Sequence, residues 1–104
     1  MQRITVKELK ERLNAGEKLN ILDVREPYEF ADFNIGGRLL PLGKIQSMQL
    51  DELEDWKEQE IIVHCRSGAR SQTACQFLET LGYTNTKNLE GGMNAWQQQE
   101  QSVK

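Results

Sequence analysis

Residues 61–71 read Ile-Ile-Val-His-Cys-Arg-Ser-Gly-Ala-Arg-Ser and place a cysteine directly after an apolar run typical of a buried strand. Gly68 permits a tight loop, and residues 69–81 carry apolar side chains at helical spacing. The amides of residues 66–70 can then turn toward the Cys65 sulfur, and the positive end of the following helix points the same way. Such surroundings lower a thiol pKa and offer donors to an oxyanion. We therefore expect Cys65 to attack an anion or to carry a transferable group.

The elements that must position this cysteine alternate between helices and strands. We expect a helix after the capping box at Thr5, strands at 19–24, 61–64 and 84–89, an edge or strand end at 39–42, and helical segments at 27–30, 45–56, 69–81 and 92–96. This order predicts an α/β domain with a small, open, mostly parallel sheet and helices on both faces. Ligands bind at the carboxyl ends of such strands. Cys65 lies at one such end, and Asp23 and Arg25 should lie on the same rim.

Length and composition limit the classes of function. The 104 residues are expected to form one domain over residues 1–96, followed by a frayed polar tail at 97–104. Thirteen basic and sixteen acidic residues give a net charge of −3 without any Lys/Arg-rich run, so nucleic acid is not an expected partner. No apolar stretch approaches the roughly 20 residues of a membrane span, and residues 1–13 do not resemble a signal peptide. We expect a cytoplasmic protein with no membrane partner.

The two cysteines are expected to be free thiols. Most of the residues between Cys65 and Cys75 are predicted to be helical, which separates the two by about 10 Å, beyond the roughly 7 Å limit for a disulfide. Free thiols suit a reducing compartment. Cys75 is interpreted as a small packing residue, and Trp56 and Trp96 as core residues.

Three motifs, in this order and spacing, carry a family resemblance. They are Asp23-Val24-Arg25-Glu26 followed by Glu29-Phe30, the loop Cys65-Arg66-Ser67-Gly68-Ala69-Arg70, and Gly91-Gly92-Met93-Asn94-Ala95-Trp96. Together they resemble the single-domain rhodanese-like sulfurtransferases, from the helix at Thr5 to Trp96. One segment departs from the family pattern: Asn34-Ile35-Gly36-Gly37-Arg38 stands where members show a His-Ile pair followed by Pro-Gly-Ala, and it is about one residue shorter. This departure affects the expected wall of the pocket, where Arg38 and Lys44 are interpreted as solvated surface charges.

The resemblance implies an enzyme of the thiosulfate sulfurtransferase type. Cys65 would accept the outer sulfur of a small anionic donor such as thiosulfate, become a persulfide, and pass the sulfur to a thiol, to cyanide or to a sulfur-accepting protein. No cofactor and no metal are implied. The residues expected to bind substrate are Arg66, Ser67, Gly68, Ala69 and Arg70, with Asp23 and Arg25 in support. In one interpretation, Arg66 and Arg70 both add positive charge for the anionic donor. In the other, Arg66 points to solvent and Arg70 holds the loop.

A cysteine-dependent phosphatase is the first alternative, because such enzymes also use a His-Cys loop closed by Arg-Ser, here Arg70-Ser71. Those loops place five residues between the cysteine and the arginine, whereas this chain has four, which leaves less room for a phosphoryl group. Asp23 is the only obvious general acid on the rim. We expect it instead to accept backbone amides or to pair with Arg25.

A sulfur relay or regulatory module that discharges only to a protein partner is the second alternative. A Cys/His catalytic pair is not expected, because successive side chains on a strand point to opposite faces and His64 should face away from Cys65. We interpret His64 as a buried, hydrogen-bonded histidine, so the loop amides must activate the thiolate.

Overall fold

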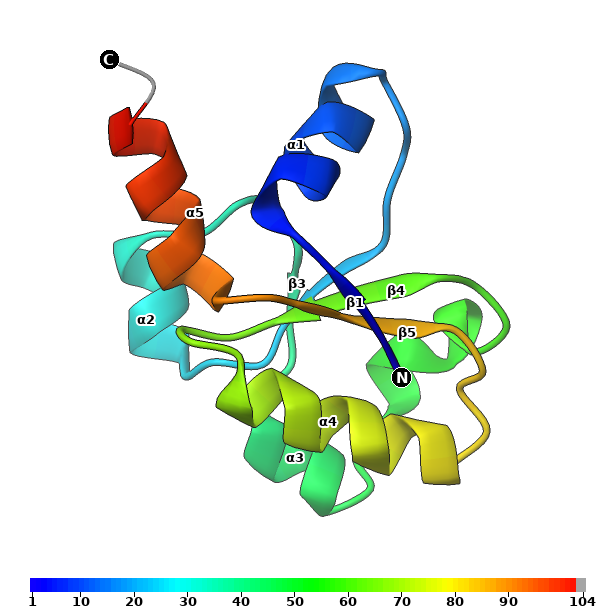
Figure 1. The fold of residues 1–104 in the computed structure, drawn as a ribbon. Coiled ribbons are helices and arrows are strands. Elements are labelled where there is room, and N and C mark those ends of the chain that lie inside the picture. The colour runs from blue at the N-terminus through cyan, green and yellow to red at the C-terminus, as the bar shows by residue number, and fades with distance from the viewer. Residues whose placement is uncertain (103–104) are drawn as a thin grey trace.

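The computed structural model describes residues 1–102, with side-chain burial and contacts through residue 99. Within them, five strands form one parallel sheet in the order β1-β5-β4-β2-β3 (Figure 1). The strands are β1 (Gln2–Ile4), β2 (Ile21–Asp23), β3 (Arg38–Leu39), β4 (Ile61–His64) and β5 (Thr86–Leu89). The central strand β4 is buried along its whole length, as expected of a parallel strand with both faces covered.

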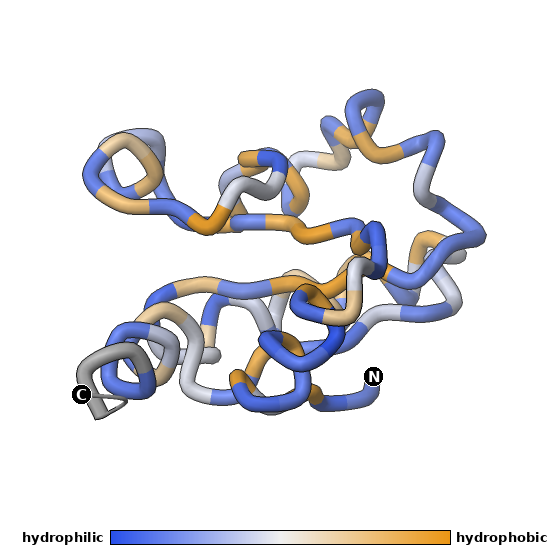
Figure 2. The backbone as a smooth tube through the Cα atoms, turned by 90° about the horizontal axis from the view of Figure 1, so that it is seen from above, coloured by the Kyte–Doolittle hydropathy of each residue, from blue (hydrophilic) through white to orange (hydrophobic). Residues whose placement is uncertain are grey.

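Helices cover both faces of the sheet. They are α1 (Val6–Asn14), α2 (Pro27–Asp32), α3 (Leu42–Gln46), a 3-10 helix η1 (Asp51–Trp56), α4 (Ala69–Thr80) and α5 (Gly92–Ser102). Figure 1 shows α1, α2 and α5 on one side of the sheet and α3 and α4 on the other. Apolar residues concentrate in the inner segments of the chain, and polar residues on the outer turns (Figure 2). The predicted α/β class with helices on both faces is therefore confirmed.

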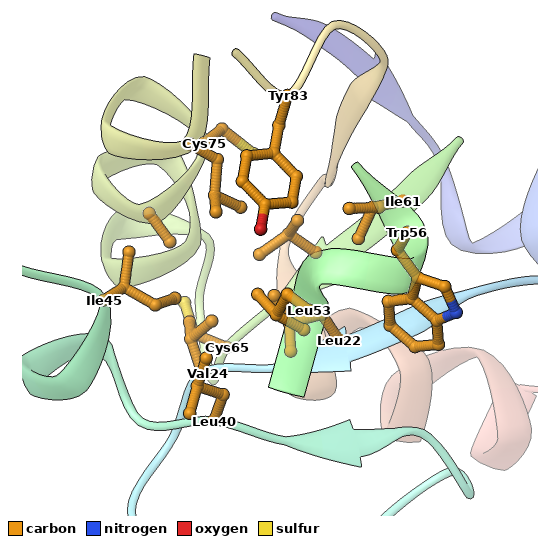
Figure 3. Packing of buried hydrophobic residues seen from close by; sticks show 13 residues of the cluster. Leu22, Val24, Leu40, Ile45, Leu53, Trp56, Ile61, Cys65, Cys75 and Tyr83 are labelled. Carbon is orange, nitrogen blue, oxygen red and sulfur yellow. The ribbon is translucent and has the colours of Figure 1, made fainter. Parts of the chain in front are cut away.

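Two apolar clusters result from the alternation of side chains along β4. Ile61 and Cys65 point into the first cluster, against α3, η1 and α4 (Figure 3). Ile62 points into the second, which contains Leu9 of α1 and Trp96 of α5. Each cluster closes one face of the sheet and leaves the carboxyl ends of the strands at one edge.

Several local predictions are confirmed by the structure. Thr5 and Glu8 form a reciprocal capping box, in which the Glu8 amide donates to Thr5 Oγ1 at 3.1 Å and the Thr5 amide donates to Glu8 Oε1 at 2.9 Å. Trp56 and Trp96 are both buried, one in each cluster. Cys65 and Cys75 are buried free thiols.

The predicted helix over residues 45–56 is wrong, because the chain breaks it into α3 and η1. Met48 takes a left-handed φ of 62° and is 66 % exposed. The amide of Gln49 donates to the Lys44 carbonyl at 2.9 Å, which closes the end of α3. Ile45 and Leu53 still pack on the same cluster, so the apolar spacing imitates one continuous helix.

The two ends of the chain also differ from prediction. β1 was not predicted, because only Ile4 of its three residues is buried. At the other end, α5 continues through Ser102, so residues 97–102 of the predicted tail are helical and 103–104 lie outside the described residues. Glutamine favours helix, which explains the continuation beyond Trp96. A domain boundary at residue 96 stays a prediction. No helix in the described part of the chain is long and apolar enough to cross a membrane.

Candidate functional site

Cys65 follows β4 at the carboxyl edge of the sheet, and its sulfur has two close polar neighbours. The Gly68 amide donates to Sγ at 3.1 Å, and the Ser71 hydroxyl lies 3.4 Å from it. Gly68 has a φ of 108°, which permits the loop to fold back over the cysteine. Cys65 is only 1 % exposed. The loop therefore surrounds the sulfur with donors.

These donors decide the acidity of the thiol. Burial raises the pKa of Cys65, but hydrogen bonds from the Ser71 hydroxyl and from the amides of Ser71, Gly68 and Ser67 lower it by more. The pKa of Cys65 therefore lies below its ordinary value. In contrast, burial raises the pKa of Cys75 to about 11, so Cys75 is a thiol at neutral pH. Of the two cysteines, only Cys65 is prepared for nucleophilic chemistry.

Ser71 and Asn88 complete the site, and sequence reasoning did not select either as a site residue. Both are buried. The Ser71 hydroxyl can donate to the Gly68 carbonyl oxygen, at 3.1 Å, or to Asn88 Oδ1. Asn88 Nδ2 donates to Gly68 O at 3.2 Å. Ser71 had a visible signal, since it follows Arg70 in the first turn of the predicted helix. Asn88 had none, because it lies on β5, 23 residues after Cys65.

The start of α5 fixes the loop from above. The amides of Met93 and Asn94 donate to the carbonyls of Cys65 and Arg66, each at 2.9 Å. A Cβ atom on Gly92 would lie 2.3 Å from the Cys65 carbonyl oxygen, so only glycine permits this approach. The third sequence motif thus acts as a backbone clamp on the cysteine.

Asp23 and Arg25 lie on the rim beside β4, where the sequence placed them. Arg25 is 5 % exposed and donates to both carboxylate oxygens of Asp23, with Nε to Oδ1 at 2.9 Å and Nη2 to Oδ2 at 2.8 Å. It also donates to the Phe33 carbonyl at 2.6 Å. The expected pairing of Asp23 with Arg25 is present, and it leaves Asp23 engaged in structure.

His64 is buried, as expected, but the prediction that it is hydrogen-bonded is wrong. Within the described chain, neither ring nitrogen has a hydrogen-bond partner. Its Nε2 lies 3.8 Å from Asp23 Oδ2, too far for a hydrogen bond, and that carboxylate is already bound to Arg25. Burial lowers the pKa of His64 to about 4. His64 is therefore neutral near pH 7.

Comparison with known proteins decides the family. A family model described as a rhodanese-like domain matches residues 5–99. The chain belongs to the rhodanese-like domain family. A putative sulfurtransferase of Bacillus subtilis, YtwF, is 37 % identical over 98 residues, which cover 93 % of this chain and 91 % of that protein. A sulfurtransferase of Allochromatium vinosum is 38 % identical over 89 residues, covering 85 % and 80 %. These relatives support an enzyme of the rhodanese family.

A solved structure agrees with the fold. The crystal structure of a rhodanese-like domain protein from Staphylococcus aureus superimposes with a TM-score of 0.82 at 34 % identity and covers 92 % of this chain and 91 % of that one. Within the described part of this rhodanese-like domain, no group of three or more His, Cys, Asp or Glu side chains is placed to hold a metal ion.

The two arginines of the rhodanese loop have different surroundings. Arg70 donates through Nη1 and Nη2 to the two carboxylate oxygens of Glu29 on α2, at 2.8 and 3.0 Å. Arg66 is exposed, and its guanidinium makes no hydrogen bond or ion pair with a described residue. Arg70 is thus tied to α2, whereas Arg66 keeps a free positive charge.

Two hollows flank the rhodanese loop. One, of about 380 Å³, is lined by Arg66 together with residues of α2 and α5. The other, of about 460 Å³, is lined by Ser67, Gly68, Ala69 and Asn88, with Arg3 of β1. Arg38 reaches neither hollow: it pairs with Asp55 and stacks on Trp56, while Lys44 is exposed. The shortened 34–38 segment therefore brings no arginine to the loop.

Proposed function

We propose that this protein moves sulfane sulfur from an anionic donor such as thiosulfate to a thiophilic acceptor through a persulfide on Cys65. The single observation that carries the proposal is the position of the Cys65 sulfur, which receives the Gly68 amide at 3.1 Å inside a loop of inward-facing amides. The same donors that stabilise a thiolate also stabilise the charged persulfide. The loop therefore suits both forms of the catalytic cysteine.

The first half-reaction is a displacement at sulfur. The Cys65 thiolate attacks the sulfane sulfur of thiosulfate and forms a new S–S bond, while the S–S bond of thiosulfate breaks and its electron pair leaves on sulfite. In the second half-reaction the acceptor, a thiolate or cyanide, attacks the terminal sulfur. The bond to Sγ breaks, and its electron pair returns to Cys65 as the thiolate. The enzyme is unchanged after one cycle.

Arg66 is the residue that we propose for attracting the anionic donor. Its guanidinium is uncommitted, and it adjoins the catalytic cysteine in the chain. Arg70, in contrast, holds the loop through Glu29. Ser67, Gly68 and Ala69 would contribute their backbone amides to the donor and the persulfide.

Three observations support sulfur transfer over phosphate-ester hydrolysis. Only four residues separate Cys65 from Arg70. In addition, the Arg70 guanidinium is bound at two points by Glu29, so it is not free to grip a phosphoryl group. Asp23 is also engaged, with Arg25, and is not free to protonate a leaving group.

The test is persulfide formation. Purified, reduced protein is incubated with excess thiosulfate, and the intact mass is measured for the wild type, Cys65→Ser and Cys75→Ser. We expect one added sulfur atom on the wild type and on Cys75→Ser, because the thiol of Cys75 stays protonated, and none on Cys65→Ser. Hydrolysis of a phosphate ester is measured in parallel and is expected to be absent.

Other results would change the conclusion. Sulfur uptake by Cys65→Ser contradicts the proposed nucleophile. Ester hydrolysis that needs Cys65, without a sulfur adduct, indicates the phosphatase. A persulfide that forms but is discharged neither by cyanide nor by a small thiol indicates a relay that requires a protein acceptor.

A further inference from the structure

Asn88 joins the two groups that touch the catalytic sulfur. It lies on β5 opposite Val63 of β4, is 6 % exposed, and directs its side-chain amide toward the loop. Its Oδ1 accepts from Ser71, and its Nδ2 donates to the Gly68 carbonyl at 3.2 Å. Within the described residues, Asn88 makes no hydrogen bond to the Cys65 sulfur. Its two partners, Gly68 and Ser71, each contact that sulfur.

The Gly68 contact matters because glycine has no conformational preference of its own to hold the loop. Gly68 accepts a wide range of backbone angles, so its amide stays on Sγ only if other groups restrict it. Its carbonyl is held by Asn88 Nδ2 and by the Gln72 amide at 3.1 Å. The first is a side-chain restraint from a different element of the fold, and it ties the loop to the central part of the sheet.

The Ser71 contact matters because a hydroxyl has a single hydrogen. Three acceptors surround Ser71 Oγ: Sγ of Cys65, the Gly68 carbonyl and Asn88 Oδ1. The Gly68 carbonyl already receives two donors, so Asn88 Oδ1 and the Cys65 sulfur compete for the Ser71 hydroxyl hydrogen. When Cys65 is a thiol, Ser71 donates to Asn88. When Cys65 is a thiolate, the charge-assisted bond to sulfur is the stronger one.

We propose that Asn88 is a positioning residue for sulfur transfer, which holds the Gly68 carbonyl so that the Gly68 amide stays on the Cys65 sulfur. It is not a catalytic residue, because it acts through Gly68. The proposal rests on the proposed role of Cys65 as the nucleophile. It adds to that role a residue on β5 that sets how much thiolate and persulfide charge the loop can stabilise.

The charged and titratable groups around Cys65 are independent of this arrangement. Arg70 is bound to Glu29 of α2, and Arg25, which follows β2, is bound to Asp23. The other groups near the loop or the cysteine are His64 on the opposite face of β4, Cys75 on α4, the exposed Arg66 and Arg3 of β1, beside Asn88 in the sheet. Among the residues that the structure describes, no hydrogen bond or ion pair joins any of these side chains to the Asn88 amide. Replacing Asn88 therefore changes the donors on sulfur without removing a charge.

The test measures the thiol directly and does not require any sulfur donor. The rate of iodoacetamide alkylation at Cys65, located by peptide mass, is recorded against pH. We expect Asn88→Ala to raise the midpoint of this profile by about one pH unit, the typical effect of weakening a hydrogen bond to a charged group. Alkylation at a pH below both midpoints should then slow about tenfold. Asn85→Ala is the matched control, since Asn85 is an exposed asparagine just before β5 and should leave the midpoint unchanged.

Two further variants keep the test decisive. If Asn88→Ala does not fold, Asn88→Leu removes both hydrogen bonds at nearly equal volume in a buried strand position. Ser71→Ala should raise the midpoint as well, because it removes the hydroxyl donor from the sulfur. The shift caused by Asn88→Ala should be at least as large in a Ser71→Ala background, because Gly68 carries it and the competition for the Ser71 hydrogen is gone.

The opposite results overturn the proposal. A lower midpoint of urea unfolding with an unmoved alkylation profile makes Asn88 a purely structural residue. Loss of the Asn88→Ala shift in the Ser71→Ala background excludes action through Gly68. Because alkylation is read without thiosulfate, these failures are distinct from a failure of sulfur uptake, which would contradict the proposed function instead.

Discussion

Arg70 and Glu29 form a two-point ion pair, with Nη1 to Oε1 at 2.8 Å and Nη2 to Oε2 at 3.0 Å. The pair links the first turn of α4, which carries the end of the cysteine loop, to α2 on the other side of the sheet rim (Figure 1). The side chain of Glu29 is 12 % exposed and that of Arg70 is 35 % exposed. Arg70 therefore holds the end of the cysteine loop against α2.

Replacing Arg70 should cost more stability than donor affinity. Arg70→Ala leaves Glu29 without its partner, and we expect a loss of about 1 kcal/mol and a fall in Tm of about 5 °C. Persulfide formation at saturating thiosulfate should continue. Glu29→Gln is the matched variant and should lower Tm similarly. Loss of donor binding by Arg70→Ala at unchanged Tm would instead assign Arg70 to the substrate.

Replacing Arg66 should have the reverse effect, with a loss of donor affinity and no loss of stability. Arg66→Ala removes an uncommitted charge beside the cysteine, so we expect KM for thiosulfate to rise about fivefold, with Tm unchanged. Arg3→Ala removes the same charge from the hollow on the other side of the loop and serves as the control. Equal effects of the two variants would mean that only net charge matters. High salt should reduce the difference between Arg66→Ala and the wild type.

His64 should make the fold sensitive to mild acid. Its pKa is about 4 in the folded chain because it is buried, against about 6.5 when unfolded, so the unfolded chain takes up the proton first. Stability is then complete above about pH 6.5 and falls as pH drops toward 4, by about 2–3 kcal/mol.

His64→Leu should flatten this part of the urea-unfolding profile. The contribution of Glu29 has a separate window, because its hydrogen bond with Arg70 lowers its pKa to about 2, and stability from that pair is lost between about pH 4.5 and 2. An unchanged slope between pH 6.5 and 4 in His64→Leu would contradict the assignment to His64.

The two glycines Gly92 and Gly43 offer a matched test of the backbone clamp on Cys65. A Cβ at Gly92 meets the Cys65 carbonyl oxygen at 2.3 Å, and the residue has a φ of 53°, whereas a Cβ at Gly43 meets nothing within 4 Å. Gly92→Ala should destabilise the domain by about 3 kcal/mol and slow sulfur uptake, because α5 must move off the loop. Gly43→Ala lies in α3 and should be neutral or slightly stabilising. Normal sulfur uptake by Gly92→Ala would show that the clamp is dispensable.

The elements that could be predicted were those with a strong local pattern. The strand 61–64, the helix after Gly68 and the capping box at Thr5 have near-neighbour causes: β-branched apolar runs, a left-handed glycine and a reciprocal side-chain cap. The break at Met48 escaped prediction because both sides of it pack on one cluster and keep helical spacing across the gap. β1 escaped because its stability comes from pairing with β5, which is distant in the chain.

The sequence by itself determined the position of the cysteine proposed as the nucleophile, the loop that surrounds it and the rim on which Asp23 and Arg25 lie. A strand followed by a glycine turn and a helix dictates these features through local backbone geometry. Only the tertiary structure decided which arginine is free and which is bound, that His64 is buried without a hydrogen bond, and that Asn88 joins Gly68 to Ser71. Each depends on a partner brought close by the parallel pairing of β2, β4 and β5 or by the packing of α2 against the loop, and no local pattern encodes such distant contacts.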